Sequence, residues 1–370
     1  MQRLRAAVRD KDTVTRQGGD EFVIMLDDIS QTEDATTVAL TILEAMNRRF
    51  IVADTPLHMS ASIGVSLYPS DGKDAETLLK HADVAMYRAK DRGRNTFTFY
   101  AADMNVHTAE KMAMEDRLRG ALERGEFQLD YQPQYDARTG DILGAEALLR
   151  WRNDQGEQIP PDTFVPLLEE TGLINEVGAW IIDRACEQLA AWHNRGWSHL
   201  RMAINISSRQ VSDARLPQQV SAALGRWKLP PRQLELEITE SLLVTQDATT
   251  ENVLQRLIDL DVLLAVDDFG TGYSSLSYLH RLSIDTLKID RAFVTNIPAN
   301  EDSMAIARAI IGLGHSLHLN LVAEGVETKE QHVFLRELGC HMMQGYLFSR
   351  PVSAAGFSRL VEADQAADAS

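Results

Sequence analysis

Acidic residues alternate with apolar residues in short segments whose composition is typical of β-strands. Residues 234–238 read Leu-Glu-Leu-Glu-Ile, and residues 262–267 read Val-Leu-Leu-Ala-Val-Asp. Because successive side chains of a strand point to opposite faces, the apolar residues can pack outward, which turns Glu235, Glu237 and Asp267 inward. A buried carboxylate is costly unless it is paired or binds a metal. Glu237 and Asp267 are therefore candidates for one shared site.

Six more polar residues also lie near the ends of expected strands. They are Glu146, Asn205, Asp268, Lys288, Glu324 and Gln344. Carboxylates with an amide carbonyl form a hard oxygen site, which suits Mg²⁺ or Mn²⁺ better than zinc. The adjacent Asp267 and Asp268 indicate a bridge to a second metal. Two metals would polarise a phosphoryl oxygen and lower the pKa of a bound water, while Lys288 would stabilise charge or orient that water. The pattern predicts a divalent-metal site for phosphodiester chemistry.

Each of these residues also has a purely structural explanation when it is taken singly. Two consecutive aspartates are typical of a turn, and Lys288 could form a structural ion pair with Asp290. A shared site is favoured because the residues recur at the end of nearly every expected strand. Residues 267–276 place two glycines and small hydroxyl residues after the aspartate pair, and we interpret them as a functional loop that can turn sharply and move.

The segments that position these residues form an alternating α/β pattern from Phe127 to about Val361. A length of roughly 240 residues with about eight strands is typical of a (β/α)-barrel, whose active site lies at the carboxyl ends of the strands. Only residues 136–140 separate the first two runs, whereas a parallel pair needs a crossover of about a dozen residues. We therefore expect a hairpin and one antiparallel strand in the barrel. The expected strands are 128–134, 142–151, 201–206, 234–238, 262–267, 286–289, 320–324 and 341–345.

The remaining residues are divided by their patterns into three further parts. Residues 1–101 mix short strands (22–26, 60–68 and 96–100) with amphipathic helices (35–49 and 75–90), as in an α+β domain. Residues 102–125 indicate one charge-rich amphipathic helix, of which 102–116 is assigned as a helical linker. The barrel domain is placed at 117–363, and the polar residues 364–370 are expected to form a flexible tail.

Composition excludes several classes of protein. The 370 residues include 54 acidic and 37 basic side chains, a formal net charge of −17. Such a chain should not bind a nucleic acid polymer through bulk electrostatics, because Lys and Arg clusters supply most of that affinity. No apolar run approaches the roughly 20 residues of a membrane span, and no apolar signal region follows residue Met1. The two cysteines, Cys186 and Cys340, exclude a disulfide framework and predict a cytoplasmic location.

Short motifs in the barrel region resemble the EAL family of cyclic di-GMP phosphodiesterases over about residues 118–360. Glu146 opens Glu-Ala-Leu, with Leu-Arg-Trp after it. The other matches are Asn205 in Asn-Ile-Ser, Glu237 in Glu-Ile-Thr-Glu, Asp267 and Asp268 in Asp-Asp-Phe-Gly-Thr-Gly, Lys288 in Leu-Lys-Ile-Asp, Glu324 and Glu327 in Ala-Glu-Gly-Val-Glu, and Gln344 in Gln-Gly-Tyr. The resemblance implies an enzyme that cuts one phosphodiester bond of cyclic di-GMP to give linear pGpG, using two Mg²⁺ or Mn²⁺ ions.

The resemblance also implies a role for each matching residue. Glu146, Asn205, Glu237 and Asp267 would hold the first metal, and Asp267 would bridge to a second metal with Asp268 beside it. Glu324, as general base, Lys288 and Glu146 are the expected catalytic residues. The expected ligand-binding and supporting residues are Arg150, which would contact a phosphate, Glu240, which would anchor the glycine loop, and Gln344, Glu327 and Asp290. A homodimer through the EAL part is a further expectation.

Residues 1–101 resemble part of a GGDEF diguanylate cyclase domain. Gly-Gly-Asp-Glu-Phe at 18–22 is complete and reads as a hairpin turn, with Asp20 as a metal ligand and Glu21 as a nucleotide contact. Arg9 and Asp12 resemble the product-inhibition site of that family, and Lys90 and Arg94 resemble its phosphate contacts. The N-terminal half of the family's domain, with the other metal-binding aspartate, is not in the sequence. We therefore expect this segment not to carry a complete cyclase site.

Two other functions compete with a phosphodiesterase. In the first, the barrel binds cyclic di-GMP as a receptor without cutting it. Such receptors usually lack one or more of the metal carboxylates, all of which this sequence keeps. In the second, the full protein is a bifunctional cyclase and phosphodiesterase, which requires the missing N-terminal half.

Overall fold

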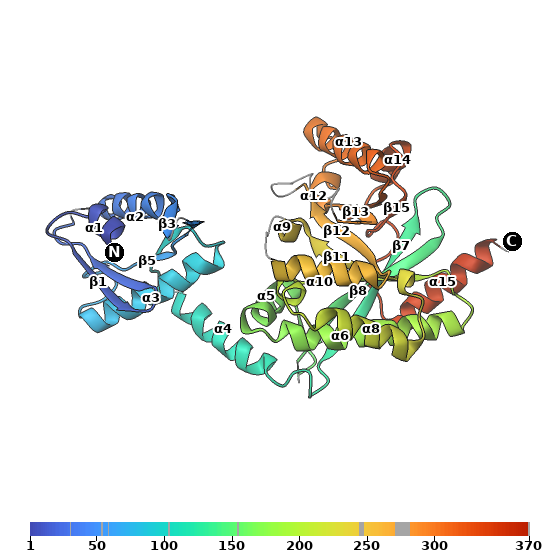
Figure 1. Cartoon of the computed structure of the whole chain (residues 1–370), viewed down its shortest axis with the longest axis horizontal. Coiled ribbons are helices and arrows are strands. Elements are labelled where there is room, and N and C mark those ends of the chain that lie inside the picture. Colours follow the sequence, from blue (N-terminus) through green and yellow to red (C-terminus); the bar gives the residue numbers. More distant parts are fainter. Residues whose placement is uncertain are drawn as a thin grey trace. The chain divides into compact units, whose positions relative to one another are not determined.

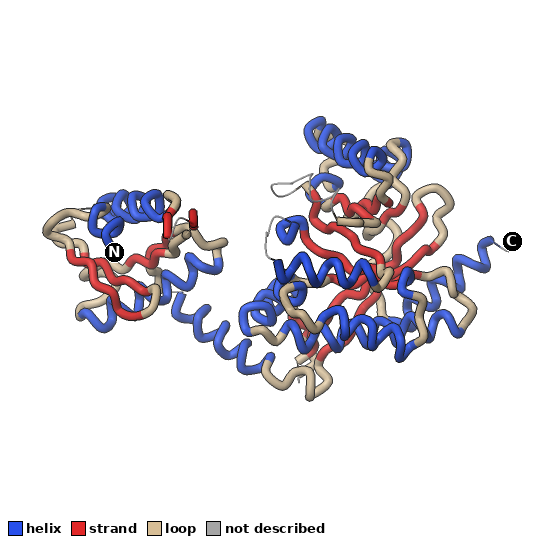
Figure 2. Tube along the Cα trace, viewed as in Figure 1, coloured by secondary structure: helices blue, strands red, loops and turns tan. Residues whose placement is uncertain are grey.

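The structure is a computed structural model of the chain, and it divides into two compact units, Met1–Asp116 and Arg117–Ser370. It describes residues 1–29, 31–52, 55–57, 59–102, 104–153, 155–243, 248–270 and 282–368. Figure 1 labels the helices and strands along the chain, and Figure 2 separates them by type. None of the described helices is long and apolar enough to cross a membrane.

The first unit is an α+β arrangement of short strand pairs and helices. Antiparallel β1 and β2 form the expected hairpin around Gly-Gly-Asp-Glu, in which Gly19 has a φ of +50°. Strand β5 pairs in parallel with β6, and α3 packs against both. The elements are α1 (Gln2–Ala6), β1 (Thr13–Gly18), β2 (Glu21–Met25), α2 (Thr32–Asn47), β3 (Phe50–Val52), β4 (Thr55–Leu57), β5 (Ile63–Val65), α3 (Ala75–Asp91), β6 (Phe97–Phe99) and α4 (Met104–Leu118).

The second unit is a closed barrel with one antiparallel strand, as the sequence predicts. The strand order is β10-β11-β12-β13-β14-β15-β7-β8, and β8 pairs with β10 to close the ring. Strand β7 runs antiparallel to both β8 and β15, and the short β9 extends the sheet beside β8. The strands are β7 (Phe127–Asp136), β8 (Ile142–Arg152), β9 (Gln158–Ile159), β10 (Arg201–Asn205), β11 (Leu234–Thr239), β12 (Leu263–Phe269), β13 (Thr286–Ile289), β14 (Asn320–Ala323) and β15 (Met342–Met343).

Helices lie around the barrel strands in Figure 1. Leu234, Leu236 and Ile238 of β11 are all buried, as their alternation with glutamate requires. Trp192 of α6 stacks on Phe357 of α15, with ring centroids 4.3 Å apart. The helices are α5 (Pro161–Thr171), α6 (Ile174–Asn194), α7 (Ser208–Val211), α8 (Leu216–Trp227), α9 (Glu240–Leu243), α10 (Ala248–Asp259), α12 (Arg291–Val294), α13 (Glu301–Ser316), α14 (Lys329–Glu337) and α15 (Ala354–Asp368), with the 3₁₀-helix η1 at Pro231–Gln233.

The structure corrects two expectations about helix ends. The helix expected over 102–125 ends at Leu118, and Gly120 then adopts a φ of +79°, a left-handed conformation that stops a helix. The tail expected to be flexible from residue 364 instead continues α15 to Asp368. The carboxylate of Asp364 accepts a hydrogen bond from the backbone N–H of Ile142 at 3.0 Å, and the Gln365 side chain accepts one from the Trp197 ring at 3.2 Å.

Candidate active site

A buried lysine lies among four carboxylates at the carboxyl ends of the barrel strands. Lys288 of β13 has no exposed surface. Its Nζ lies 2.6 Å from Glu237 Oε2, 2.7 Å from Glu324 Oε1 and 3.2 Å from Asp267 Oδ2, and 3.7 Å from Glu146 Oε2. Strands β8, β11, β12 and β13 supply four of these side chains, and Glu324 directly follows β14. We call these five residues the acidic cluster.

Amide side chains hold Glu146 from both sides. Asn205 Nδ2 donates to Glu146 Oε1 at 2.5 Å, and Gln344 Nε2 donates to Glu146 Oε2 at 2.6 Å. Gln344 Nε2 also donates to Gln132 Oε1 at 3.0 Å, and Gln134 Nε2 donates to Gln344 Oε1 at 3.2 Å. Both oxygens of Glu146 are therefore directed by hydrogen bonds, so its orientation is fixed before any ligand binds.

Negative charge exceeds positive charge in the acidic cluster. Burial, with the neighbouring charge of Glu146, raises the pKa of Glu237 well above its usual value. Burial also raises the pKa of Glu324 to about 8, although Lys288 acts in the opposite direction. Burial alone would lower the pKa of Lys288, but the surrounding carboxylates outweigh it and hold that pKa well above its usual value. The cluster thus keeps its ammonium charged and favours a further cation.

The donor set of the cluster fits a hard divalent cation. Glu237 Oε1 is buried and has no hydrogen-bond partner in the described structure, so one carboxylate oxygen is free for a ligand. The other donors are carboxylate and amide oxygens, which Mg²⁺ and Mn²⁺ prefer. No group of three or more His, Cys, Asp or Glu side chains among the described residues has the spacing of a ready metal shell. Lys288 lies at the centre of these acids, so its ammonium supplies the charge that a metal would otherwise supply.

The second aspartate of the pair is the last residue but one of β12, just before the loop. Asp268 has a φ of +55°, and its backbone N–H donates to Asp267 Oδ1 at 2.8 Å. Burial, then the charge of Asp267 and a hydrogen bond with Asp290, raises the pKa of Asp268 to about 6. Glu240 Oε2 accepts a hydrogen bond from the backbone N–H of Gly270 at 2.8 Å, which fixes the start of the loop. Of the expected functional loop 267–276, residues 271–276 lie outside the described residues.

Three of the expected site residues have other contacts in the structure. Arg150 Nε pairs with Asp130 Oδ2 at 3.0 Å, on β7 rather than in the acidic cluster. Glu327 is exposed, and its backbone N–H donates to Gln331 Oε1 at 2.7 Å. Asp290 caps α12 through the backbone N–H of Ala292 at 2.8 Å, besides its contact with Asp268. Their part in ligand binding stays a prediction.

Sequence reasoning missed the glutamines of β7. Gln132 and Gln134 are buried, and through Gln344 they connect to Glu146. The signal was present, because the two residues alternate along an expected strand and therefore share its inward face. Glu235 was expected to point inward and does, but it accepts a hydrogen bond from Thr286 Oγ1 at 2.8 Å, one layer below the acidic cluster.

The first unit places its motif residues on the surface. Asp20 and Glu21 are exposed in the β1–β2 turn. The carboxylate of Asp12 accepts hydrogen bonds from the backbone N–H groups of Arg9 at 2.8 Å and Asp27 at 3.2 Å, so the Arg-x-x-Asp segment forms a turn. Lys90 lies 5.3 Å from the ring centroid of Tyr87.

The second unit is a closed α/β-barrel with acidic side chains at the carboxyl ends of its strands. That end is the face at which barrel enzymes have their active sites. The family profile described as EAL domain matches residues 115–351, and the profile described as diguanylate cyclase, GGDEF domain, matches residues 1–96. The chain therefore belongs to the EAL family and carries a GGDEF-type segment before its EAL domain.

Several relatives share this arrangement. The bifunctional diguanylate cyclase/cyclic di-GMP phosphodiesterase MucR of Pseudomonas aeruginosa is 43% identical over 95% of this chain and 51% of its own length. The cyclic di-GMP phosphodiesterase NbdA of the same organism is 41% identical over 98% of this chain and 46% of its own length. The chain thus spans about half the length of these curated relatives. A solved structure, PaMucR phosphodiesterase in a c-di-GMP complex, is 44% identical, with a TM-score of 0.64, over 66% of this chain and 99% of that one.

Proposed function

We propose that the barrel hydrolyses one phosphodiester bond of cyclic di-GMP to give linear pGpG. The acidic cluster around Lys288 carries this proposal, because its oxygens suit a divalent cation at the face where barrel enzymes act. The relatives described as cyclic di-GMP phosphodiesterases, and the related barrel solved with c-di-GMP, support the choice of substrate.

The cofactor in this proposal is Mg²⁺ or Mn²⁺, two ions per barrel. Glu146, Asn205, Glu237 and Asp267 would hold one ion, and Asp267 with Asp268 would hold the other. When bound, the ions would polarise the phosphoryl oxygen and lower the pKa of a coordinated water.

Residues of the chain itself supply positioning and proton transfer. Glu324 acts as the general base, because its carboxylate lies 2.7 Å from the Lys288 ammonium and beside the acids that would hold the metal ions. Lys288 stays charged and stabilises the negative charge that develops on the phosphoryl group. Asn205 and Gln344 fix both oxygens of Glu146. Glu240 anchors the loop, and Arg150 contacts a ligand phosphate after releasing Asp130.

The test is incubation of the purified chain with cyclic di-GMP and Mg²⁺, followed by chromatography of the products. We expect linear pGpG, its loss after exhaustive chelation, and at least a tenfold lower rate for Glu146→Gln, or about 1.4 kcal/mol of barrier. The matched control is Glu330→Gln, on the exposed surface of α14. Tight binding of cyclic di-GMP without any hydrolysis would instead identify the barrel as a receptor.

Association and location complete the proposal. We place the chain in the cytoplasm, in keeping with its two buried free cysteines, and as a homodimer through the EAL domain. Light scattering of the active enzyme at the assay concentration tests the dimer. A fully active monomer would remove association from the mechanism.

A further inference from the structure

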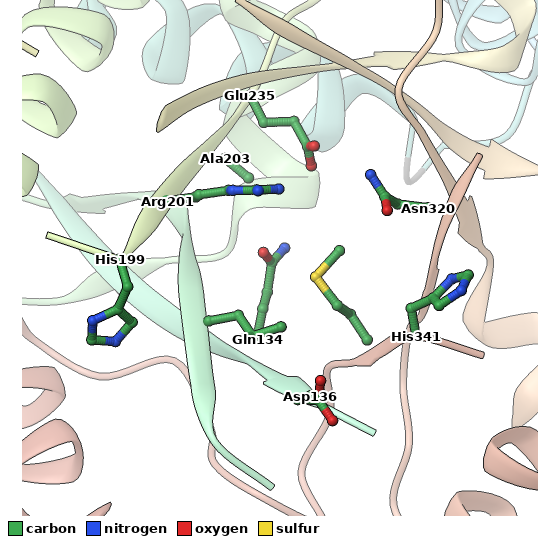
Figure 3. A pocket seen from close by; sticks show the side chains of 10 residues that line it. Gln134, Asp136, His199, Arg201, Ala203, Glu235, Asn320 and His341 are labelled. Atoms are coloured by element: carbon green, nitrogen blue, oxygen red, sulfur yellow. The ribbon is translucent and has the colours of Figure 1, made fainter. Parts of the chain in front are cut away.

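A polar pocket with a volume of about 250 Å³ lies at the end of the barrel opposite to the acidic cluster. Figure 3 shows the side chains that line it. Its lining residues come from the amino ends of the parallel strands. Arg201 opens β10, Glu235 is the second residue of β11, and Asn320 opens β14. Gln134 joins them from the last part of β7, which runs in the opposite direction. The pocket is therefore distinct from the site at the carboxyl ends.

The buried carboxylate of Glu235 and the exposed guanidinium of Arg201 face this pocket without forming an ion pair, and Asp136 lines it as well. Figure 3 shows the Glu235 carboxylate and the Arg201 guanidinium both directed into the space. Within the described part of the chain, Arg201 forms no side-chain hydrogen bond and no ion pair within 4.0 Å. Glu235 is only 5% exposed, and Thr286 Oγ1 donates to its Oε2 at 2.8 Å. Its other oxygen is left for a group in the pocket.

Small and apolar side chains leave room between the two charges. Ala203 pairs in register with Glu235 on the neighbouring strand, so a single methyl group lies where a longer side chain would fill the barrel. Leu143 and Met342 add apolar wall to the pocket. Pockets for drug-sized ligands usually measure about 300–1,000 Å³, so this space suits a smaller molecule.

We propose that this pocket binds a small zwitterion of the α-amino-acid type. The ligand's carboxylate would pair with Arg201, and its ammonium group would pair with Glu235. A zwitterion is favoured over a simple anion or cation because its ammonium group compensates the buried Glu235 carboxylate while its carboxylate pairs with the exposed Arg201 guanidinium, whereas a singly charged molecule pairs with one of the two groups. The amide groups of Gln134 and Asn320 can bond to a polar side chain of the ligand.

The pocket wall is connected to the acidic cluster through the interior of the barrel. Gln134 donates to Gln344 at 3.2 Å, and Gln344 donates to Glu146 at 2.6 Å. A ligand that draws Gln134 toward the pocket therefore changes a bond that positions Glu146. Binding of the amino acid would therefore regulate the acidic cluster. This regulatory role rests on the proposed phosphodiesterase function, whereas the binding of the amino acid does not.

The test is isothermal titration calorimetry of the whole chain with each proteinogenic L-amino acid at millimolar concentration. We expect at least one to bind, and we expect the matching α-hydroxy acid and the matching amine to bind at least tenfold more weakly. Absence of heat with every amino acid would overturn the proposal. Equal binding of the amine or the hydroxy acid would also overturn it, because the ligand would not need both charges.

Two variants locate the binding. Arg201→Met keeps the apolar stem, and Glu235→Gln keeps an acceptor for Thr286, so each removes a charge with little change in shape. Each should weaken binding at least tenfold, or about 1.4 kcal/mol. The control is Arg336→Met, on the exposed face of α14. If Arg201→Met fails to fold, the affinity of Glu235→Gln for the amino acid alone tests the proposal. Unchanged affinity in either folded variant would show that the amino acid does not bind in this pocket. The rate of cyclic di-GMP hydrolysis with and without the bound amino acid then tests regulation separately.

Discussion

Removal of the lysine at the centre of the acidic cluster should destabilise the metal-free barrel strongly. Lys288 is fully buried, and in Lys288→Met its four carboxylate neighbours would lose their shared cation. Removing one partner of a buried ion pair usually costs about 3–5 kcal/mol, because the remaining charge has no compensation. We expect a loss of that size in the free energy of unfolding, reduced only as far as the acids take up protons.

The assay is urea unfolding in the presence of a chelator, followed by tryptophan fluorescence. All 5 tryptophans lie in the barrel unit, so the signal reports the unfolding of that unit. With a slope of about 3 kcal/mol per molar urea, the expected loss lowers the unfolding midpoint by about 1–2 M. The control, Lys329→Met, changes an exposed lysine on α14 and should stay within about 0.5 kcal/mol of the wild type.

A divalent cation should recover part of the lost stability. Added Mn²⁺ supplies positive charge to the same carboxylates, and a ligand that binds only the folded state stabilises it. The stability gained with Mn²⁺ should therefore be larger for Lys288→Met than for the wild type. If Lys288→Met lost no more stability than Lys329→Met, the view of the acidic cluster as a charge-compensated unit would be wrong.

Two further predictions concern packing and thiol chemistry. A Cβ on Gly345 would overlap the backbone of Val326, so Gly345→Ala should lower both the stability and the hydrolysis rate. Gly312 of α13 has open space around it, so Gly312→Ala should be neutral or should stabilise the protein by up to about 1 kcal/mol. Urea unfolding and hydrolysis rates of the two variants test this difference. Burial raises the pKa of both Cys186 and Cys340 to about 12, which leaves almost no thiolate at pH 8. Mass spectrometry after iodoacetamide treatment should find neither thiol modified in the native protein and both modified in urea, and fast native modification would contradict the burial.

The inward acids were predictable because a strand encodes its two faces with a period of two residues. The alternation in residues 234–238 was sufficient to place Glu235 and Glu237 inside, and the short connection before Ile142 was sufficient to predict the antiparallel strand. Strand ends were less accurate, since β14 ends at Ala323 and leaves Glu324 just beyond it. Local pattern thus predicts orientation better than length.

Features that depend on distant partners were not predictable from local sequence. The polar residues after position 363 continue a helix, supported by bonds from Asp364 and Gln365 to residues far away in the chain. The position of Lys288 at the centre of four acids depends on four neighbouring segments, each of which alone suggests only an inward polar residue. The bond of Arg150 to Asp130 likewise needs the pairing of β7 with β8.

Direct measurement of metal binding tests the central claim, which is that the acidic cluster holds divalent cations. Electron paramagnetic resonance detects free Mn²⁺, so titration of the chelator-treated chain gives the number of bound ions and their affinity. We expect two bound Mn²⁺ ions per chain in the wild type, at least tenfold weaker binding in Glu237→Gln, and unchanged binding in Glu330→Gln. Equal Mn²⁺ binding by all three proteins would show that the ions lie outside the acidic cluster.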